Sequence, residues 1–342
     1  MSHALIPLSW VYGAGVALDR RARMVAKLPS DVHPHVISVG NLEAGGNGKT
    51  PLAMWLLERA HAEQKTCAYV SRGYGGTTVS SAVVTCVLAG NVSPPSLAGL
   101  RVLSRGHRDL PAHAGDEGAL VCERAPFASA FFCADKTRAV AAAIASDAGV
   151  IILDDAFQSW RVPRHQDIVL LDAEHPLDGG QLLPAGRLRE GPDALARADA
   201  IVFNGAGTPA AVGAARAQVE RWLRPQVPVA GMERRVELTP VAGEAVPPHG
   251  PFLAVSALAR PAAFERSLKS AGVSIVAHVI YADHHRYEAR DVARIAGEAR
   301  GANAVAVVTT EKDWVKLRHL DMPLPVWLAR LDVSLIGDEL PG

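Results

Sequence analysis

The sequence predicts an α/β protein built on a mostly parallel sheet, with a second, smaller α/β domain after the first. Two observations carry this prediction: short continuous apolar segments alternate with helical segments, and one proline-containing segment divides the series in two. Continuous apolar runs bounded by turn residues are typical of strands buried on both faces of a parallel sheet. We therefore expect a larger domain over residues 1–228 and a smaller one over residues 229–342.

The larger domain has five candidate strands, at residues 35–40, 67–70, 149–155, 167–172 and 200–204. Its candidate helices lie at residues 51–62, 136–147 and 210–223. Pro225 and Pro228 mark residues 223–229 as a linker. The second series has strand candidates at 252–258, 274–281, 304–310 and 325–329, with helices that end at 271 and cover 288–300.

The composition is that of a folded protein with no overall charge. Of 342 residues, 49% are hydrophobic and 20% charged, which excludes a disordered chain. The 35 Lys and Arg residues balance 35 Asp and Glu residues, which excludes a basic field over the whole surface for nucleic acid. The cysteines lack C-x-x-C spacing, so we expect neither a disulfide framework nor a zinc site; they are Cys67, Cys86, Cys122 and Cys133.

The N-terminal segment is apolar from residue 4 to residue 18 and basic directly afterwards. It is shorter than the roughly 20 residues of a membrane-spanning helix. A secretory signal has the opposite order, with positive charge before the apolar run. Two interpretations remain open: a helix over about residues 4–27 that lies in the headgroup plane of an anionic leaflet, or an ordinary first helix packed on its own domain. The basic residues are Arg20, Arg21, Arg23 and Lys27.

The segment GNLEAGGNGKTP, residues 40–51, follows a strand candidate and precedes a helix candidate. This is the context of a Walker A loop, whose glycines let backbone amides surround phosphate oxygens. Lys49 is then expected to contact the β- and γ-phosphates, and Thr50 to bind Mg²⁺. Glu43 stands where the strict motif has a glycine. We expect a nucleotide site formed by Gly45, Gly46, Asn47, Gly48, Lys49 and Thr50.

A second motif, GVIILDDAFQ, ends an apolar strand candidate in Asp154 and Asp155. A Walker B strand delivers a carboxylate to the magnesium beside a phosphate-binding loop in this way. The alternative is that the two acids cap the next helix. With the Walker A segment upstream we favour magnesium, and Gln158 follows in a position to contact the same site.

The residues alone do not identify what is phosphorylated. Asp116 and Glu117 by themselves read as a solvated pair, and His284 and His285 as a structural or solvated pair. A P-loop ATPase or kinase is one candidate function. A P-loop GTPase or metallochaperone is another, although the segment TEKDW lacks the N/T-K-x-D spacing of a guanine site. A third candidate is a membrane-bound adaptor with a vestigial P-loop.

Nine segments together resemble the tetraacyldisaccharide 4'-kinase family, in family order and across nearly the whole chain. They are PLSWVYG, ISVGNLEAGGNGKTP, SRGYGG, GDEGAL, LDDAFQ, DIVLLD, LLPAGRLRE, YADHHRY and TTEKDWVKL. The resemblance implies transfer of the γ-phosphate of ATP to the 4'-hydroxyl of a tetraacylated glucosamine disaccharide 1-phosphate, which gives lipid IVA in lipid A biosynthesis. It also implies peripheral attachment to the cytoplasmic face of the inner membrane, which favours the membrane interpretation of the N-terminal segment.

The resemblance further implies roles for individual residues. Asp116 matches an aspartate that accepts the hydroxyl proton, and His284 matches the histidine that supports it. Glu190 is implied at the metal, alongside Thr50, Asp154 and Asp155. Arg72, Gln158 and Arg189 are implied as substrate or phosphate contacts.

This chain departs from the family pattern at three positions outside those roles. Relatives often have a glycine where Ala156 stands, a histidine where Ser159 stands and a proline where Gly118 stands. We assign no role to Ser159. None of the three departures removes a residue that the resemblance places in the chemistry.

Overall fold

A computed structural model describes residues 5–45, 48–77, 79–90, 92, 96–242, 250–283 and 285–340. In these residues one thirteen-stranded sheet runs through the molecule in the order β11-β10-β12-β13-β9-β8-β7-β1-β6-β2-β5-β3-β4. Neighbouring strands are parallel except β3 with β5 and β9 with β13. The α/β class with a mostly parallel sheet is confirmed.

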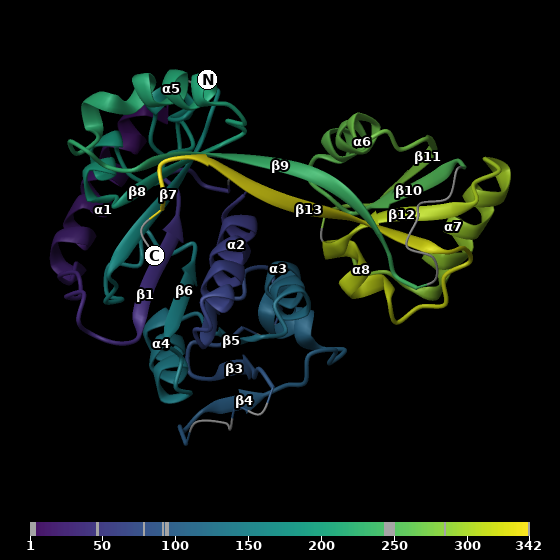
Figure 1. Cartoon of the computed structure of the whole chain (residues 1–342), viewed down its shortest axis with the longest axis horizontal. Helices are drawn as coiled ribbons and strands as arrows, with labels where there is room; N and C mark the ends of the chain where they lie inside the picture. The colour runs from purple at the N-terminus through teal and green to yellow at the C-terminus, as the bar shows by residue number, and fades with distance from the viewer. Residues whose placement is uncertain are drawn as a thin grey trace.

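The larger part holds the first half of the sheet and most of the helices (Figure 1). Its strands are β1 (His35–Gly40), β2 (Cys67–Ser71), β3 (Val84–Val87), β4 (Leu100–Val102), β5 (Ala128–Phe132), β6 (Val150–Asp154), β7 (Gln166–Asp172) and β8 (Ala200–Asn204). Its α-helices are α1 (Ile6–Arg23), α2 (Lys49–Ala62), α3 (Leu110–Arg124), α4 (Lys136–Ala145) and α5 (Pro209–Val219). Short 3-10 helices are η2 (Asp178–Gly180), η3 (Pro192–Arg197) and η4 (Glu220–Trp222).

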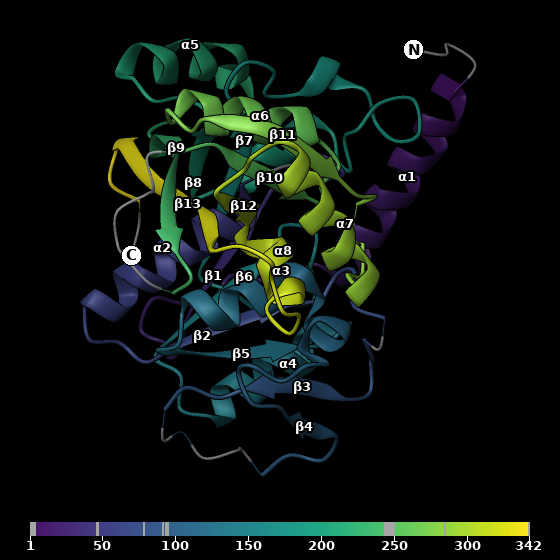
Figure 2. The same cartoon turned by 90° about the vertical axis from the view of Figure 1, so that its right-hand side faces the viewer.

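The smaller part continues the sheet with three parallel strands. These are β10 (Phe252–Ser256), β11 (Ile275–Ile280) and β12 (Ala306–Thr310), and the helices are α6 (Pro261–Ser270), α7 (Ala289–Gly301) and α8 (Glu311–Leu317). Helix α8 packs against α3 of the larger part, and the two helices lie side by side in both cartoon views (Figures 1 and 2). The smaller part therefore contacts the larger one next to the GDEGAL segment.

Two long strands join the parts, β9 (Val229–Pro240) and β13 (Val326–Gly337). They pair antiparallel from Ala230–Gly337 to Pro240–Trp327 and extend visibly from one part to the other in Figure 1. The start of β9 also pairs with β8, and the start of β13 pairs with β12. The segment expected as a linker ends where β9 begins, so the transition between the parts follows this strand pair and not a single residue.

The parallel strands are buried on both faces, which accounts for their unbroken apolar runs. In β6, Val150 and Ile152 pack in the core that includes the α2 side chains, while Ile151 and Leu153 pack in the core that includes α4. Strand β13 is different because its exposure alternates through much of its length. The sequence predicted only residues 325–329 of it, since a half-exposed strand lacks a continuous apolar run.

Candidate active site

The first candidate residues lie where β1 ends and α2 begins. Gly48 caps the helix at φ 113°, in the left-handed region, and a Cβ there would come within 2.8 Å of the Met232 side chain. Lys49 and Thr50 then open the helix, whose free backbone amides favour an anion. Lys49 Nζ donates to the Gly45 carbonyl at 2.7 Å and lies 3.7 Å from Asp155 Oδ1. Gly46 and Asn47 lie outside the described residues.

Thr50 and Asp154, from the two sequence motifs, lie close together in the structure. The Thr50 hydroxyl lies within hydrogen-bond distance of two carboxylate oxygens, 2.7 Å from Glu117 Oε2 and 3.2 Å from Asp154 Oδ2. The Tyr69 hydroxyl donates to the same Asp154 Oδ2 at 2.6 Å. Burial raises the pKa of Asp154, and the hydrogen bond from Tyr69 opposes that effect. Asp154 Oδ1 is buried and has no hydrogen-bond partner within the described structure.

Asp155 belongs to a more exposed group of charges at the same strand end. Arg189 holds its carboxylate with two hydrogen bonds, of 2.7 and 3.1 Å, and also donates to the Asn41 side chain. Burial acts to raise the pKa of Asp155, but the Arg189 hydrogen bonds and the Lys49 charge lower it to about 2. Asp155 is therefore an anion throughout the physiological range.

Lys136, at the start of α4, fixes the backbone between the two aspartates. Its side chain is buried, and Nζ donates to the Asp154 carbonyl oxygen at 2.6 Å and to that of Asp155. Burial lowers the pKa of this lysine to about 8, against the opposing charges of Asp155 and Asp154. Arg72, exposed after β2, adds positive charge that acts on Lys136 in the same direction as burial.

Glu190 is buried, and its carboxylate forms ion pairs with two arginines. Arg197 donates to both carboxylate oxygens, at 2.8 and 3.0 Å, and Arg20 of α1 lies 3.4 Å away. Gln158 donates to Glu190 at 3.1 Å and to the Asn41 carbonyl at 3.0 Å. The charge of the buried Glu190 is thus compensated by ion pairs, one of them with α1, and its implied place at the metal stays a prediction.

Asp116 faces the smaller part across the α3–α8 contact. Gly115 just before it has φ 70°, and a Cβ there would lie 2.0 Å from the Tyr74 carbonyl oxygen, so the turn requires glycine. Asp116 Oδ2 pairs with Lys316 Nζ of α8 at 3.1 Å. His284 lies outside the described residues. Its neighbour His285 hydrogen-bonds to Asp291, which belongs to the capping box of α7.

A family model described as tetraacyldisaccharide-1-P 4'-kinase matches residues 1–340. The chain belongs to this family. A tetraacyldisaccharide 4'-kinase of Parvibaculum lavamentivorans is 33% identical over 98% of this chain and 89% of the relative. One of Geobacter metallireducens is 36% identical over 89% of this chain and 85% of the relative.

A solved relative agrees with the fold as well. The crystal structure described as the "apo" form of LpxK from Aquifex aeolicus in complex with ATP has a TM-score of 0.69 to this chain. The two are 27% identical, over 97% of this chain and 94% of that one. The family, its kinase activity and its P-loop kinase fold were all predicted from the sequence, and the comparisons confirm them.

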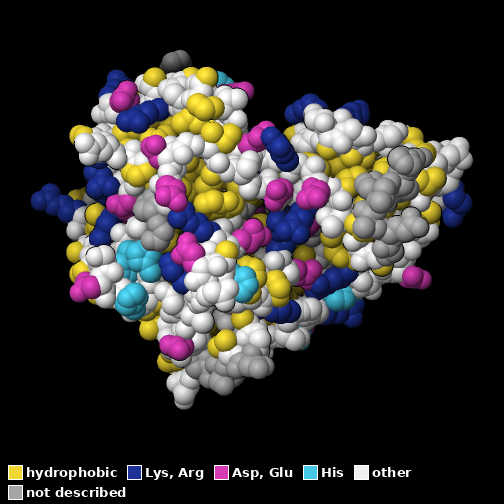
Figure 3. All heavy atoms as spheres, in the orientation of Figure 1, with side chains coloured by type: hydrophobic (Ala, Val, Ile, Leu, Met, Phe, Trp, Pro, Cys, Tyr) yellow, Lys and Arg dark blue, Asp and Glu magenta, His cyan; other side chains and the backbone are white. Residues whose placement is uncertain are grey.

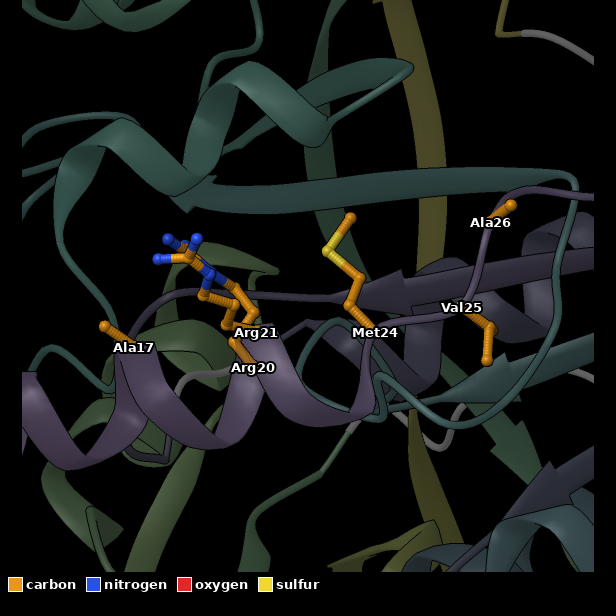
Figure 4. Close-up of a pocket in the computed structure, with 6 residues that line it drawn as sticks. All are labelled: Ala17, Arg20, Arg21, Met24, Val25 and Ala26. Carbon is orange, nitrogen blue, oxygen red and sulfur yellow. The ribbon is translucent and has the colours of Figure 1, made fainter.

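Helix α1 presents an apolar surface next to basic side chains. Trp10, Val11 and Leu18 are 72%, 71% and 70% exposed, whereas Ser9 is buried and donates to the Leu182 carbonyl at 2.9 Å. No helix in the described residues is both long and apolar enough to cross a bilayer. At the end of α1, Arg20, Arg21 and Met24 line a shallow hollow (Figure 4); its other lining residues are Ala17, Val25 and Ala26.

Four side chains of this region were not selected from the sequence, namely Tyr69, Glu117, Lys136 and Lys316. Each reaches the site from a different strand or helix, so no local spacing marks it.

Acidic and basic side chains are mixed where the two parts meet (Figure 3). Within the described residues no group of three or more His, Cys, Asp or Glu side chains forms a metal cage.

Proposed function

We propose that this member of the family binds ATP at the start of α2 and phosphorylates the 4'-hydroxyl of a tetraacylated disaccharide 1-phosphate, which gives lipid IVA. The observation that carries the proposal is the junction of Thr50 with Asp154 beside Lys49, in a chain that matches the family from end to end. The Aquifex aeolicus relative, described as bound to ATP, supports the choice of nucleotide.

Lys49 and the loop amides are proposed to hold the triphosphate. In the described structure Lys49 Nζ bonds the Gly45 carbonyl and lies near Asp155, so it is already directed along the loop. Its ammonium would neutralise charge on the β- and γ-phosphates in the transition state. We include Gly45 to Gly48 in the same site on the basis of the motif.

Mg²⁺ fits the oxygen groups beside the loop. Asp154 Oδ1 is buried without a hydrogen-bond partner in the described part of the chain. The Thr50 hydroxyl lies close to the other oxygen of Asp154 and to the Glu117 carboxylate. Hard cations such as Mg²⁺ prefer such oxygens and are often held by one or two carboxylates together with phosphates. We propose Thr50, Asp154 and Asp155 as the residues that hold it, with Glu117 added. When bound, the ion neutralises phosphate charge.

Asp116 is proposed to accept the proton of the 4'-hydroxyl as that oxygen bonds to the γ-phosphorus and the bond from this phosphorus to the β-phosphate oxygen breaks. A positioned base contributes typically about 10²- to 10⁴-fold. His284 is proposed to support Asp116 on the basis of the family resemblance. Arg72 is proposed as a phosphate contact, whereas Arg189 and Gln158 are proposed to position Asp155 and Asn41 around the substrate.

We also propose that α1 attaches the protein to the cytoplasmic face of the inner membrane. Its exposed Trp10, Val11 and Leu18 would enter the interfacial region, and its arginines would contact anionic headgroups. The acyl chains of the acceptor lie in that membrane, so attachment would bring the site to its lipid substrate.

The proposal is tested by incubating the purified protein with labelled ATP, Mg²⁺ and the acylated disaccharide 1-phosphate, and separating a bis-phosphorylated lipid. Lys49→Ala is expected to lower turnover by at least about 10²-fold while the protein still unfolds cooperatively at the wild-type temperature. Lys65→Ala, at a lysine after α2 that lies outside the site, is the matched control. Nucleotide hydrolysis without any lipid product would contradict the proposal.

A further inference from the structure

We propose that Lys316 of α8 is a positioning residue that holds Asp116 in its reactive orientation and ties it to the loop that carries His284. This inference rests on the proposed role of Asp116 as the base. It adds a residue of the smaller part, on α8, to the reaction.

The first step is the pairing itself. Lys316 Nζ lies 3.1 Å from Asp116 Oδ2, and the two side chains are only 9% and 11% exposed. An ion pair with so little solvent fixes the geometry of both groups more strongly than a surface pair does. The orientation of Asp116 therefore depends on α8 as well as on the glycine turn of α3.

The second step concerns what happens to the lysine when Asp116 takes up a proton. A buried ammonium left without a counter-charge is costly. Asp313 Oδ1 lies 3.7 Å from the same Nζ, and that oxygen is buried with no hydrogen-bond partner in the described residues. Its other oxygen accepts from the Ala257 amide and the Thr310 hydroxyl, so Asp313 is held in place. Lys316 thus keeps an anionic neighbour when Asp116 becomes neutral.

The third step links the lysine to the histidine loop. Lys316 Nζ lies 5.7 Å from the ring centroid of Tyr287, within the range of a cation–π contact. Tyr287 follows His284 in the same loop, and its ring packs edge-on against Tyr281 and His285. Lys316 therefore contacts the base on one side and the aromatic anchor of the histidine loop on the other.

Helix α8 makes other ion pairs with α3, and these provide a control. Arg318 pairs with Glu123, and Glu311 lies 3.5 Å from Arg124. Neither pair includes Asp116. Lys316→Met and Arg318→Met should therefore weaken the same helix contact, but only the first should alter the base.

The experiment measures kcat, the KM of the lipid acceptor and ATP affinity for Lys316→Met, Lys316→Arg and Arg318→Met. We expect Lys316→Met to lower kcat by about 10- to 100-fold with ATP affinity within about twofold, and Lys316→Arg to recover most of that loss. Arg318→Met should stay within about twofold of the wild-type kcat. Equal losses in the two Met variants would overturn the proposal. If Lys316→Met does not fold, Lys316→Gln takes its place.

The same substitutions in an Asp116→Ala background separate this inference from the function beneath it. If Lys316 acts through Asp116, Lys316→Met should lower the residual kcat of Asp116→Ala by less than about twofold. If Lys316→Met lowers kcat in the Asp116→Ala background as much as it does in the wild type, Lys316 acts elsewhere. That result would overturn this inference and leave the proposed function standing. If Asp116→Ala itself retains wild-type turnover, the proposed base is wrong, and the inference falls with it.

Discussion

The hydroxyl of Tyr69 donates a 2.6 Å hydrogen bond to Asp154 Oδ2, and both side chains are buried. Tyr69 comes from β2 and Asp154 from the end of the neighbouring β6. Burial raises the pKa of Asp154, and the hydrogen bond from Tyr69 is the largest interaction that lowers it. The tyrosine therefore helps the carboxylate stay ionised where magnesium would need it.

Tyr69→Phe is expected to destabilise the protein by about 1–3 kcal/mol, because a buried carboxylate oxygen loses a donor. Without that donor the pKa of Asp154 rises further, so the carboxylate protonates at a higher pH. The acid limb of Mg²⁺-dependent ATP binding should then move to higher pH, as measured by titration across a pH series. Tyr281→Phe, at a buried tyrosine of the smaller part, should leave that limb in place.

A second pH dependence is expected from Lys136, whose pKa is shifted downward, in the direction opposite to that of Asp154. Its pKa is lowered by burial from 10.5 to about 8, so between these pH values the unfolded chain binds a proton that the native lysine has released. The contribution of this group to the free energy of unfolding therefore rises with pH in that window. Lys136→Met should lose this rise in urea denaturation, whereas Lys269→Met, at an exposed lysine, should keep it.

The nucleotide motif could be predicted from the sequence because its parts are local. A buried strand, a glycine-rich turn and a helix follow one another over residues 35–62, and the aspartates of β6 directly follow an apolar run. The supporting side chains could not be predicted in this way. Thr50 and Glu117 are brought together by folding from separate helices, and Lys136 reaches two carbonyl oxygens that no side-chain pattern reveals.

Glu190 shows the same limit in a different form. The family resemblance implied a place at the metal, but the sequence could not reveal that Arg197 and Arg20 surround its carboxylate. We expect Glu190→Ala to destabilise the protein by up to about 3 kcal/mol, because it leaves the partly buried Arg197 without its partner. Arg197→Met should destabilise it comparably. The Mg²⁺ concentration for half-maximal activity should change in neither variant, and an increase confined to Glu190→Ala would instead support a metal ligand.

The apolar surface of α1 gives the last prediction. Trp10 and Leu18 are 72% and 70% exposed, and Arg21 and Arg23 follow on the same helix. Burying a large apolar side chain contributes about 1.5–3 kcal/mol, so Trp10→Asp and Leu18→Asp should each weaken binding to vesicles by about 10-fold or more. Binding should also require anionic lipid and decline with salt, because the arginines contribute through charge.

The measurement is co-flotation of the full chain with vesicles of phosphatidylethanolamine and phosphatidylglycerol, compared with neutral phosphatidylcholine vesicles. Ile144→Asp is the matched control, since Ile144 is 49% exposed on another helix, α4, of the same part. It should bind vesicles as the wild type does, and all three variants should keep turnover of an acceptor presented in detergent micelles. Equal loss of vesicle binding in the control would show that any exposed acidic substitution acts by charge. Undiminished binding of Trp10→Asp and Leu18→Asp would remove α1 from the membrane contact and leave it as a helix that packs on its own domain through Ser9.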